Sequence, residues 1–156
     1  MNGAMRFELI VLWLHVLGAI VWVGGLMYQA HVLLPAARRG PAGLFADAAR
    51  RGRPIAWTAI ALVVLTGLYN VTRLGPVERV MESGTGLVLA AKFILVLAAV
   101  ALAGQRDFAQ LPRLARALAA REDPARALGA IAWLDRAVLL LAVVIVYLGL
   151  AISRAG

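Results

Sequence analysis

The chain has 156 residues, is 63% hydrophobic and has a mean hydropathy of +0.86, which is above the roughly 45–50% apolar content of soluble domains and indicates an integral membrane protein. The absence of cysteine excludes disulfides, thiolate metal sites and iron–sulfur clusters. The formal net charge is +8, but the arginines lie between apolar spans, as expected for loops beside a membrane, so we expect a lipid bilayer and no nucleic acid as partner.

Four apolar stretches predict four transmembrane helices, at about residues 7–34, 55–74, 87–103 and 131–152. Pro35 is expected to end the first, because proline removes a backbone donor and crowds the preceding turn. Gly75 and Pro76 should end the second, and Gly104 follows the third. The predicted fold class is all-α, a four-transmembrane-helix bundle forming a single membrane domain over residues 1–156. No internal repeat is evident from the residue pattern.

The connections at 35–54 and 105–130 are basic, and each contains a stretch that predicts a short amphipathic helix. In the second connection, the apolar side chains follow i, i+3, i+4, i+7 spacing and predict a helix lying on the membrane surface; they are Leu111, Leu114, Ala115 and Leu118. Asp135 and Arg136 are interpreted as charges at the start of the fourth helix.

The arginine distribution predicts the orientation. Ten arginines lie in the connections 35–54 and 105–130, and four lie in the N-terminus, the connection between the second and third helices, and the C-terminus. The positive-inside rule therefore predicts a multi-pass protein of a bacterial-type inner membrane, with both basic loops cytoplasmic and both termini outside.

With this orientation, polar groups of all four helices fall in the outer half of the membrane. His15 would lie roughly 12 Å deep and Lys92 roughly 8 Å deep. We expect one polar site open to the outside, because buried polar groups in lipid must find partners. The candidate binding residues are His15, Lys92, Trp22, Tyr69, Asn70 and Tyr147.

His15 has two interpretations. It is either a core histidine hydrogen-bonded to a carbonyl or to Thr66, or a metal ligand or proton carrier. On a helical wheel it shares one face with Glu8, Gly18, Trp22 and Gln29, and this face should point into the bundle. His31 is turned about 160° away and lies about 24 Å along the helix, so the two histidines of one straight helix cannot bind the same metal.

Residues 15–39 resemble the first helix of the copper-resistance D (CopD) family. The resemblance rests on His15, the Trp22-Val23-Gly24-Gly25 motif seven residues later, His31, and Pro35 followed by basic residues. The segments 66–69 and 86–92 are also similar to that family. The resemblance implies copper binding or transport, for which the candidate ligands are His15, His31, Met5 and Met81. The chain is also distantly similar to HemJ-type protoporphyrinogen oxidases, with His15 and Lys92 at the matching positions.

Three functions therefore stay open: copper handling around His15, a redox protein that binds haem b or a porphyrin with His15 as axial ligand, and a membrane subunit without chemistry. Cu(I) favours thiolates and thioethers, and this chain has only four methionines. Whether the protein is an enzyme stays open, as does the choice between a monomer and a homodimer built on small residues of the first or third helix.

Overall fold

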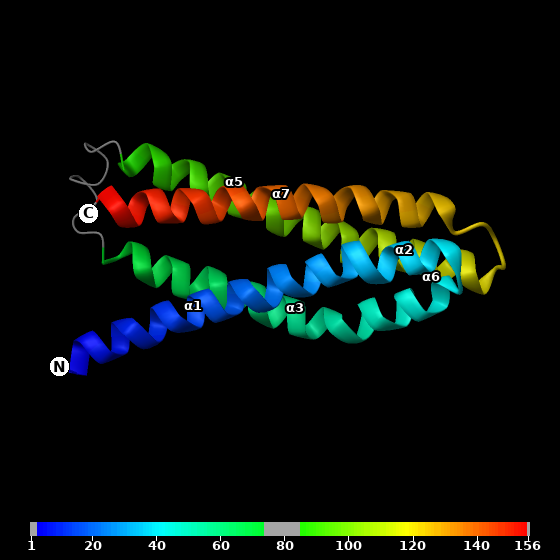
Figure 1. Cartoon of the computed structure of the whole chain (residues 1–156), viewed down its shortest axis with the longest axis horizontal. Coiled ribbons are helices and arrows are strands. Elements are labelled where there is room, and N and C mark those ends of the chain that lie inside the picture. The colour runs from blue at the N-terminus through cyan, green and yellow to red at the C-terminus, as the bar shows by residue number, and fades with distance from the viewer. Residues whose placement is uncertain (1–2, 74–84, 156) are drawn as a thin grey trace.

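The computed structural model describes residues 3–73 and 85–155, and almost all of these are helical (Figure 1). The elements are α1 (Gly3–Tyr28), the π-helical segment η1 (Gln29–Leu33), α2 (Leu34–Arg39), α3 (Ala42–Val71), α5 (Thr85–Gln105), the π-helical segment η2 (Arg106–Gln110), α6 (Leu111–Ala119) and α7 (Ala125–Ala155). Four of the resulting helices are long and apolar enough to cross a membrane. The predicted all-α, four-helix membrane architecture is confirmed.

The helices extend further than the predicted spans, and Pro35 does not end the first one. The continuous helix runs over Met5–Arg39 and contains η1 directly before the proline. There the backbone N–H of Leu34 donates to the carbonyl of Gln29, five residues back instead of four. A π turn widens the helix, so the proline ring and its missing N–H are accommodated without a break. The predicted loop 35–54 is reduced to a tight connection at Gly40 and Pro41.

A π turn also precedes a proline in the second half of the chain. The segment η2 precedes Pro112, and the N–H of Leu111 donates to the carbonyl of Arg106, again five residues back. Arg106 follows Gln29 by 77 residues, and Pro112 follows Pro35 by the same interval. The chain is therefore two structurally equivalent halves, α1-η1-α2-α3 and α5-η2-α6-α7, a repeat that the residue pattern did not reveal.

Within each half the long helices are antiparallel partners. Helix α1 packs along α3, and α5 packs along α7 (Figure 1). The two pairs lie apart at the end that holds both chain termini, which we call the terminal end, and come together toward the opposite end, which we call the turn end. Because α1 and α5 run in the same direction, the two halves are parallel repeats of the kind related by an axis along the membrane normal.

Buried apolar residues form one cluster in the middle of the bundle and another at the turn end. The middle cluster joins all four long helices and comprises Trp22, Leu26, Ala59, Ile60, Ala99, Ala103 and Val138. The turn-end cluster includes Leu34, Phe45, Leu114, Leu128 and Ile131. The amphipathic helix α6 therefore differs from expectation: Leu111 and Leu114 are buried against protein and not against the membrane surface, and Ala115 is exposed.

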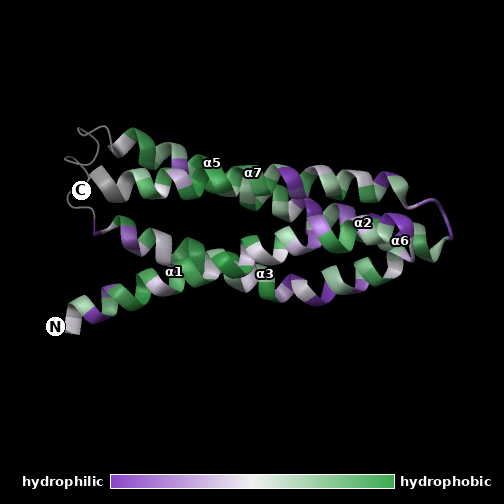
Figure 2. Ribbon diagram, viewed as in Figure 1, coloured by the Kyte–Doolittle hydropathy of each residue, from purple (hydrophilic) through white to green (hydrophobic). Residues whose placement is uncertain are grey.

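The outside of the bundle is strongly apolar. Many large apolar side chains are exposed on the long helices, and this surface suits contact with lipid. Figure 2 shows that the long helices are mostly hydrophobic and that hydrophilic residues are more frequent toward the turn end. The homodimer expected as an alternative to a monomer stays a prediction.

Candidate functional site

His15 lies on α1 at its interface with α3. Its Nδ1 atom is 3.0 Å from the Thr66 hydroxyl oxygen, and the side chain is half-buried. Gly67 provides the room for the ring, since a Cβ atom at that position would stand 3.2 Å from the His15 Cε1 atom. The contact to Thr66 confirms one of the two partners that the sequence predicted for a core histidine.

The Thr66 hydroxyl bears on which ring nitrogen of His15 carries the proton. Its oxygen lies 2.5 Å from the carbonyl of Leu62, to which the hydroxyl can donate its single proton. With that donation the 3.0 Å contact has His15 Nδ1–H as the donor. This tautomer has an unprotonated Nε2, the form in which histidine binds a metal.

Lys92 occupies the corresponding position in the second half. It follows His15 by the same interval that separates Arg106 from Gln29, and it lies on α5 against Gly149 of α7. A Cβ atom at Gly149 would stand 3.2 Å from the Lys92 Nζ atom, the same clearance as at Gly67. Each half thus places one basic side chain against a glycine of its partner helix.

Tyr69 and Asn70 lie further toward the terminal end, on α3. The Tyr69 ring packs edge-on against Phe7 with 5.6 Å between ring centroids, and its hydroxyl accepts a hydrogen bond from Arg73 Nη2 at 2.8 Å. Arg73 also pairs with Glu8 at 2.8 Å. The Tyr69 hydroxyl, and then the Glu8 carboxylate, raise the pKa of the Arg73 guanidinium. These contacts fasten α1 to α3 near the terminal end, and Asn70 is half-buried beside them.

The other predicted site residues are not gathered around His15. Tyr147 is 69% exposed on α7, and Met5 is 55% exposed near the start of α1. His31 is exposed, and its Nδ1 contacts the carbonyl of Met27, one turn earlier in the same helix, at 3.1 Å. It is 16 residues from His15 and does not share a site with it. Met81 lies outside the described residues.

A second polar region, which we call the buried charge cluster, consists of Gln29, Arg106, Asp107 and Asp135. Arg106 is at its centre: Nε donates to Asp135 at 2.6 Å, Nη1 donates to Asp107 at 2.6 Å, and Nη2 donates to the Gln29 amide oxygen. The indole N–H of Trp57 also donates to Asp107 at 2.9 Å. These contacts join both halves of the chain through four different elements, η1, α3, η2 and α7.

The sequence interpretation missed this cluster. Arg106 and Asp107 were assigned to a cytoplasmic loop, and Asp135 to the start of a helix; instead, all three are buried. The reason is that α5 continues through η2 and that α7 begins earlier than predicted, so these positions lie inside the bundle. Gln29 was placed correctly on the inward face of the first helix. One feature of the sequence could have indicated that Arg106 and Asp107 are buried: they lie shortly after the end of the third apolar span.

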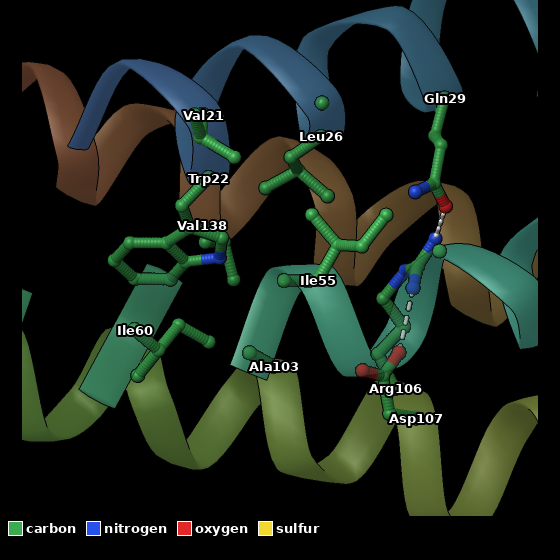
Figure 3. Close-up of a pocket in the computed structure, with 13 residues that line it drawn as sticks. Val21, Trp22, Leu26, Gln29, Ile55, Ile60, Ala103, Arg106, Asp107 and Val138 are labelled. Carbon is green, nitrogen blue, oxygen red and sulfur yellow. Dashed lines mark hydrogen bonds and ion pairs between the residues drawn. The ribbon is translucent and has the colours of Figure 1, made fainter. Parts of the chain in front are cut away.

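A cavity of about 290 Å³ lies beside the buried charge cluster (Figure 3). Trp22, Leu26, Ile60 and Val138 line its apolar part, whereas Gln29, Arg106 and Asp107 lie together at its other end. Trp22, predicted as a binding residue, thus faces this cavity. The cavity does not include His15 among its lining residues.

The described residues contain no group of three or more His, Asp and Glu side chains that could hold a metal ion. His15 offers one imidazole nitrogen, and the two aspartates of the buried charge cluster are already occupied by Arg106. Within residues 3–73 and 85–155, a metal at His15 would therefore have no cluster of His, Asp and Glu ligands and would need ligands of other kinds.

A comparison with known protein families finds one family that matches the chain. The family described as Copper resistance protein D matches residues 46–152, which is more than half of the chain. The protein belongs to the CopD family. The predicted family resemblance is thereby confirmed, although the matched region begins in α3 and leaves out the first-helix motif around His15 on which the prediction mainly rested. No curated protein and no solved structure matches the chain. This CopD-family chain is thus a multi-pass membrane protein.

Proposed function

We propose that this CopD-family protein binds or passes copper, and that His15 contacts the ion through Nε2. The observation that supports the proposal is the hydrogen bond from His15 to Thr66, because it leaves the unprotonated Nε2 as a ligand atom. Imidazole is a suitable ligand for copper in a chain without cysteine. The family description supports copper as the cargo.

The ligand set favours brief contact over storage. Tight copper sites combine several ligands, whereas the described part of the chain brings only one imidazole to this position. A single contact in a membrane bundle suits an ion that is handed on. Met5 and Met81 would then serve as additional sulfur ligands. We propose that the terminal end faces outward and that the basic turn end is cytoplasmic.

A second candidate is a haem b protein with His15 as axial ligand. The presence of a single imidazole at this position supports this candidate too, because haem supplies four nitrogen ligands to its own iron and needs only one or two from the protein. Haem would supply electron transfer. Lys92, in the equivalent position of the second half, would meet a propionate. The third candidate, a membrane subunit without chemistry, needs neither group.

The test uses the two histidines as a matched pair. His15→Ala and His31→Ala each remove one imidazole, but His31 is exposed and bonded only to the backbone of its own helix. The purified full-length proteins are titrated with Cu(I) against a chromogenic chelator, and their absorption spectra are recorded. We expect copper binding to fall at least about tenfold in His15→Ala and to remain in His31→Ala.

Three other results would decide against the copper proposal. Unchanged copper affinity in His15→Ala would overturn the role of this residue. A Soret band that disappears in His15→Ala would replace copper with haem. Absence of both signals from wild-type protein, together with unchanged copper tolerance of cells carrying His15→Ala, would favour the subunit without chemistry.

The proposed orientation is testable because the natural chain contains no cysteine. A single cysteine at Gly40 reports on the turn end, and one at Gly3 reports on the terminal end. We expect a membrane-impermeant thiol reagent added to intact cells to label Gly3→Cys and not Gly40→Cys. Labelling of Gly40→Cys alone would reverse the orientation and place His15 in the cytoplasmic half.

A further inference from the structure

The buried charge cluster has an unequal number of positive and negative groups. Arg106 contributes one positive charge, whereas Asp107 and Asp135 contribute two negative charges when both are ionised. Both carboxylates bond to the same guanidinium, and their side chains are 6% and 0% exposed. The cluster would thus carry a net negative charge inside an apolar bundle, which is costly unless a further positive charge joins it.

The surrounding elements supply no further cation to the two aspartates. On α7, Arg136 neighbours Asp135 but is exposed. On α3, Arg53 lies over the Phe108 ring at 5.6 Å, and Trp57 contributes only a neutral N–H to Asp107. On η1, Gln29 is neutral, and His31 points to its own helix backbone. Within the described residues, Arg106 is the one cation paired with these carboxylates.

Asp135 has one oxygen that is not used. Its Oδ1 accepts from Arg106, whereas its Oδ2 is buried and has no hydrogen-bond partner among the described residues. Buried polar atoms without a partner are rare in folded proteins, and an ionised oxygen is especially costly to leave unpaired. This oxygen is therefore the position at which a proton would neutralise the cluster.

Asp107 connects the cluster to the cavity. It lines the cavity of about 290 Å³ together with Arg106 and Gln29, whereas Asp135 does not line it. The Arg106 guanidinium bridges the two aspartates, and both Asp107 oxygens already accept hydrogen bonds, from Arg106 and from Trp57, so the open oxygen of the pair is Asp135 Oδ2. Intramembrane carboxylates mark proton relays in pumps and transporters.

We propose that Asp135 holds one exchangeable proton on Oδ2, and that the buried charge cluster is a proton-binding site of this membrane protein reached through the adjoining cavity. The ligand is a proton, and its binding makes the cluster neutral without breaking either bond to Arg106. This proposal does not depend on copper binding at His15, which lies on α1 and outside the cluster.

The test is infrared difference spectroscopy of the full-length protein in liposomes, recorded across a pH titration. A protonated carboxylic acid has a carbonyl band that carboxylates and amides lack, and this band shifts in heavy water. We expect wild-type protein to show such a band at mildly acidic pH, where exposed carboxyls are ionised, and to lose it reversibly as the pH is raised. In Asp135→Asn the band should lose most of its intensity.

The matched control is Asp47→Asn, which removes an exposed aspartate paired with Arg50 on the surface of α3. We expect this variant to keep the band. If Asp135→Asn does not fold, Asp107→Asn provides the second variant, and a shift or loss of the band there supports a proton held by the cluster. Wild-type protein without a protonated-carboxyl band at mildly acidic pH would overturn the proposal, as would a band unchanged in both variants.

Discussion

His15 and the buried charge cluster lie in the same apolar bundle, but their polar atoms are satisfied in different ways. His15 makes one hydrogen bond to a threonine of its partner helix through Nδ1, which is not the nitrogen proposed to bind the ion. Arg106 instead donates to three side chains from three different elements and draws both halves of the chain together. The first arrangement leaves a group available for a ligand, whereas the second uses nearly every polar atom to hold the helices.

This difference between His15 and the buried charge cluster indicates which residues contribute most to folding stability and which to ligand binding. The helix pairs lie apart at the terminal end (Figure 1), and His15 and Lys92 belong to neither buried apolar cluster. The middle and the turn end contain both apolar clusters and the buried charge cluster. Substitutions in the charge cluster should therefore affect folding most, and substitutions around His15 should affect ligand binding most.

The largest effect is expected for Arg106→Gln. This change leaves Asp107 and Asp135 buried without their cation, which should lower the free energy of unfolding by about 3–5 kcal/mol. Denaturant titration in detergent micelles measures the change. Arg113→Gln, at an exposed position of α6, removes the same charge from the surface and should stay within about 0.5 kcal/mol of wild type. Equal stability of the two variants would show that the buried pairs do not hold the bundle.

An intermediate effect is expected when the equivalent glycines of the two halves are replaced. In Gly67→Ala the new methyl group meets the rigid His15 ring at 3.2 Å, which should cost about 1–3 kcal/mol. In Gly149→Ala it meets the flexible end of Lys92 at the same distance, so the lysine can move aside. The gain in helix propensity, about 1 kcal/mol, should then keep this variant as stable as wild type or slightly more stable.

Thermal unfolding of both glycine variants, measured side by side, tests this asymmetry. If Gly149→Ala is the more destabilised of the two, the Lys92 side chain is the more tightly held group, and the picture of His15 as the fixed one is wrong.

The smallest effect on stability is expected for Thr66→Val, which removes the acceptor of the His15 Nδ1–H. Hydrogen bonds inside membrane proteins average about 0.6 kcal/mol, so the loss of stability should be of that size. Copper affinity should fall more clearly, by about 10–100-fold, because the ring is no longer held in one tautomer. Thr66→Ser keeps the hydroxyl and should bind like wild type. Unaltered affinity in Thr66→Val would separate this hydrogen bond from ligand binding.

The sequence predicted the fold because apolar spans of this length have few alternatives in a membrane. It also predicted the contact between His15 and Thr66, since both positions are interior to their spans and their depths could be counted from well-marked outer ends. The outer end of the third span was equally well marked, so the sequence placed Lys92 in the same outer half as His15. The position of Tyr147 on the helix circumference did not follow, because depth says nothing about rotation.

The buried charge cluster could not be predicted in the same way. Proline and charge both predict the end of a membrane helix, so the change from apolar to charged residues at Arg106 was interpreted as a loop. The π turn before Pro112 lets the helix continue past the proline, and the pairing with Asp135, 29 residues away, lets the Arg106 charge be buried. Local sequence predicts neither feature, because the pairing depends on how α7 packs beside η2.

The equivalence of the two halves gives the contact between Gln29 and Arg106 a further meaning. These residues occupy corresponding positions, and they touch each other where the halves meet. In an assembly of two identical subunits, this point on the symmetry axis would hold the same residue twice, and two arginines there would repel each other. Because both halves belong to one polypeptide, the two positions can carry different residues, and here a neutral acceptor faces a cation. A single chain can therefore combine an asymmetric interior with two similar helical halves.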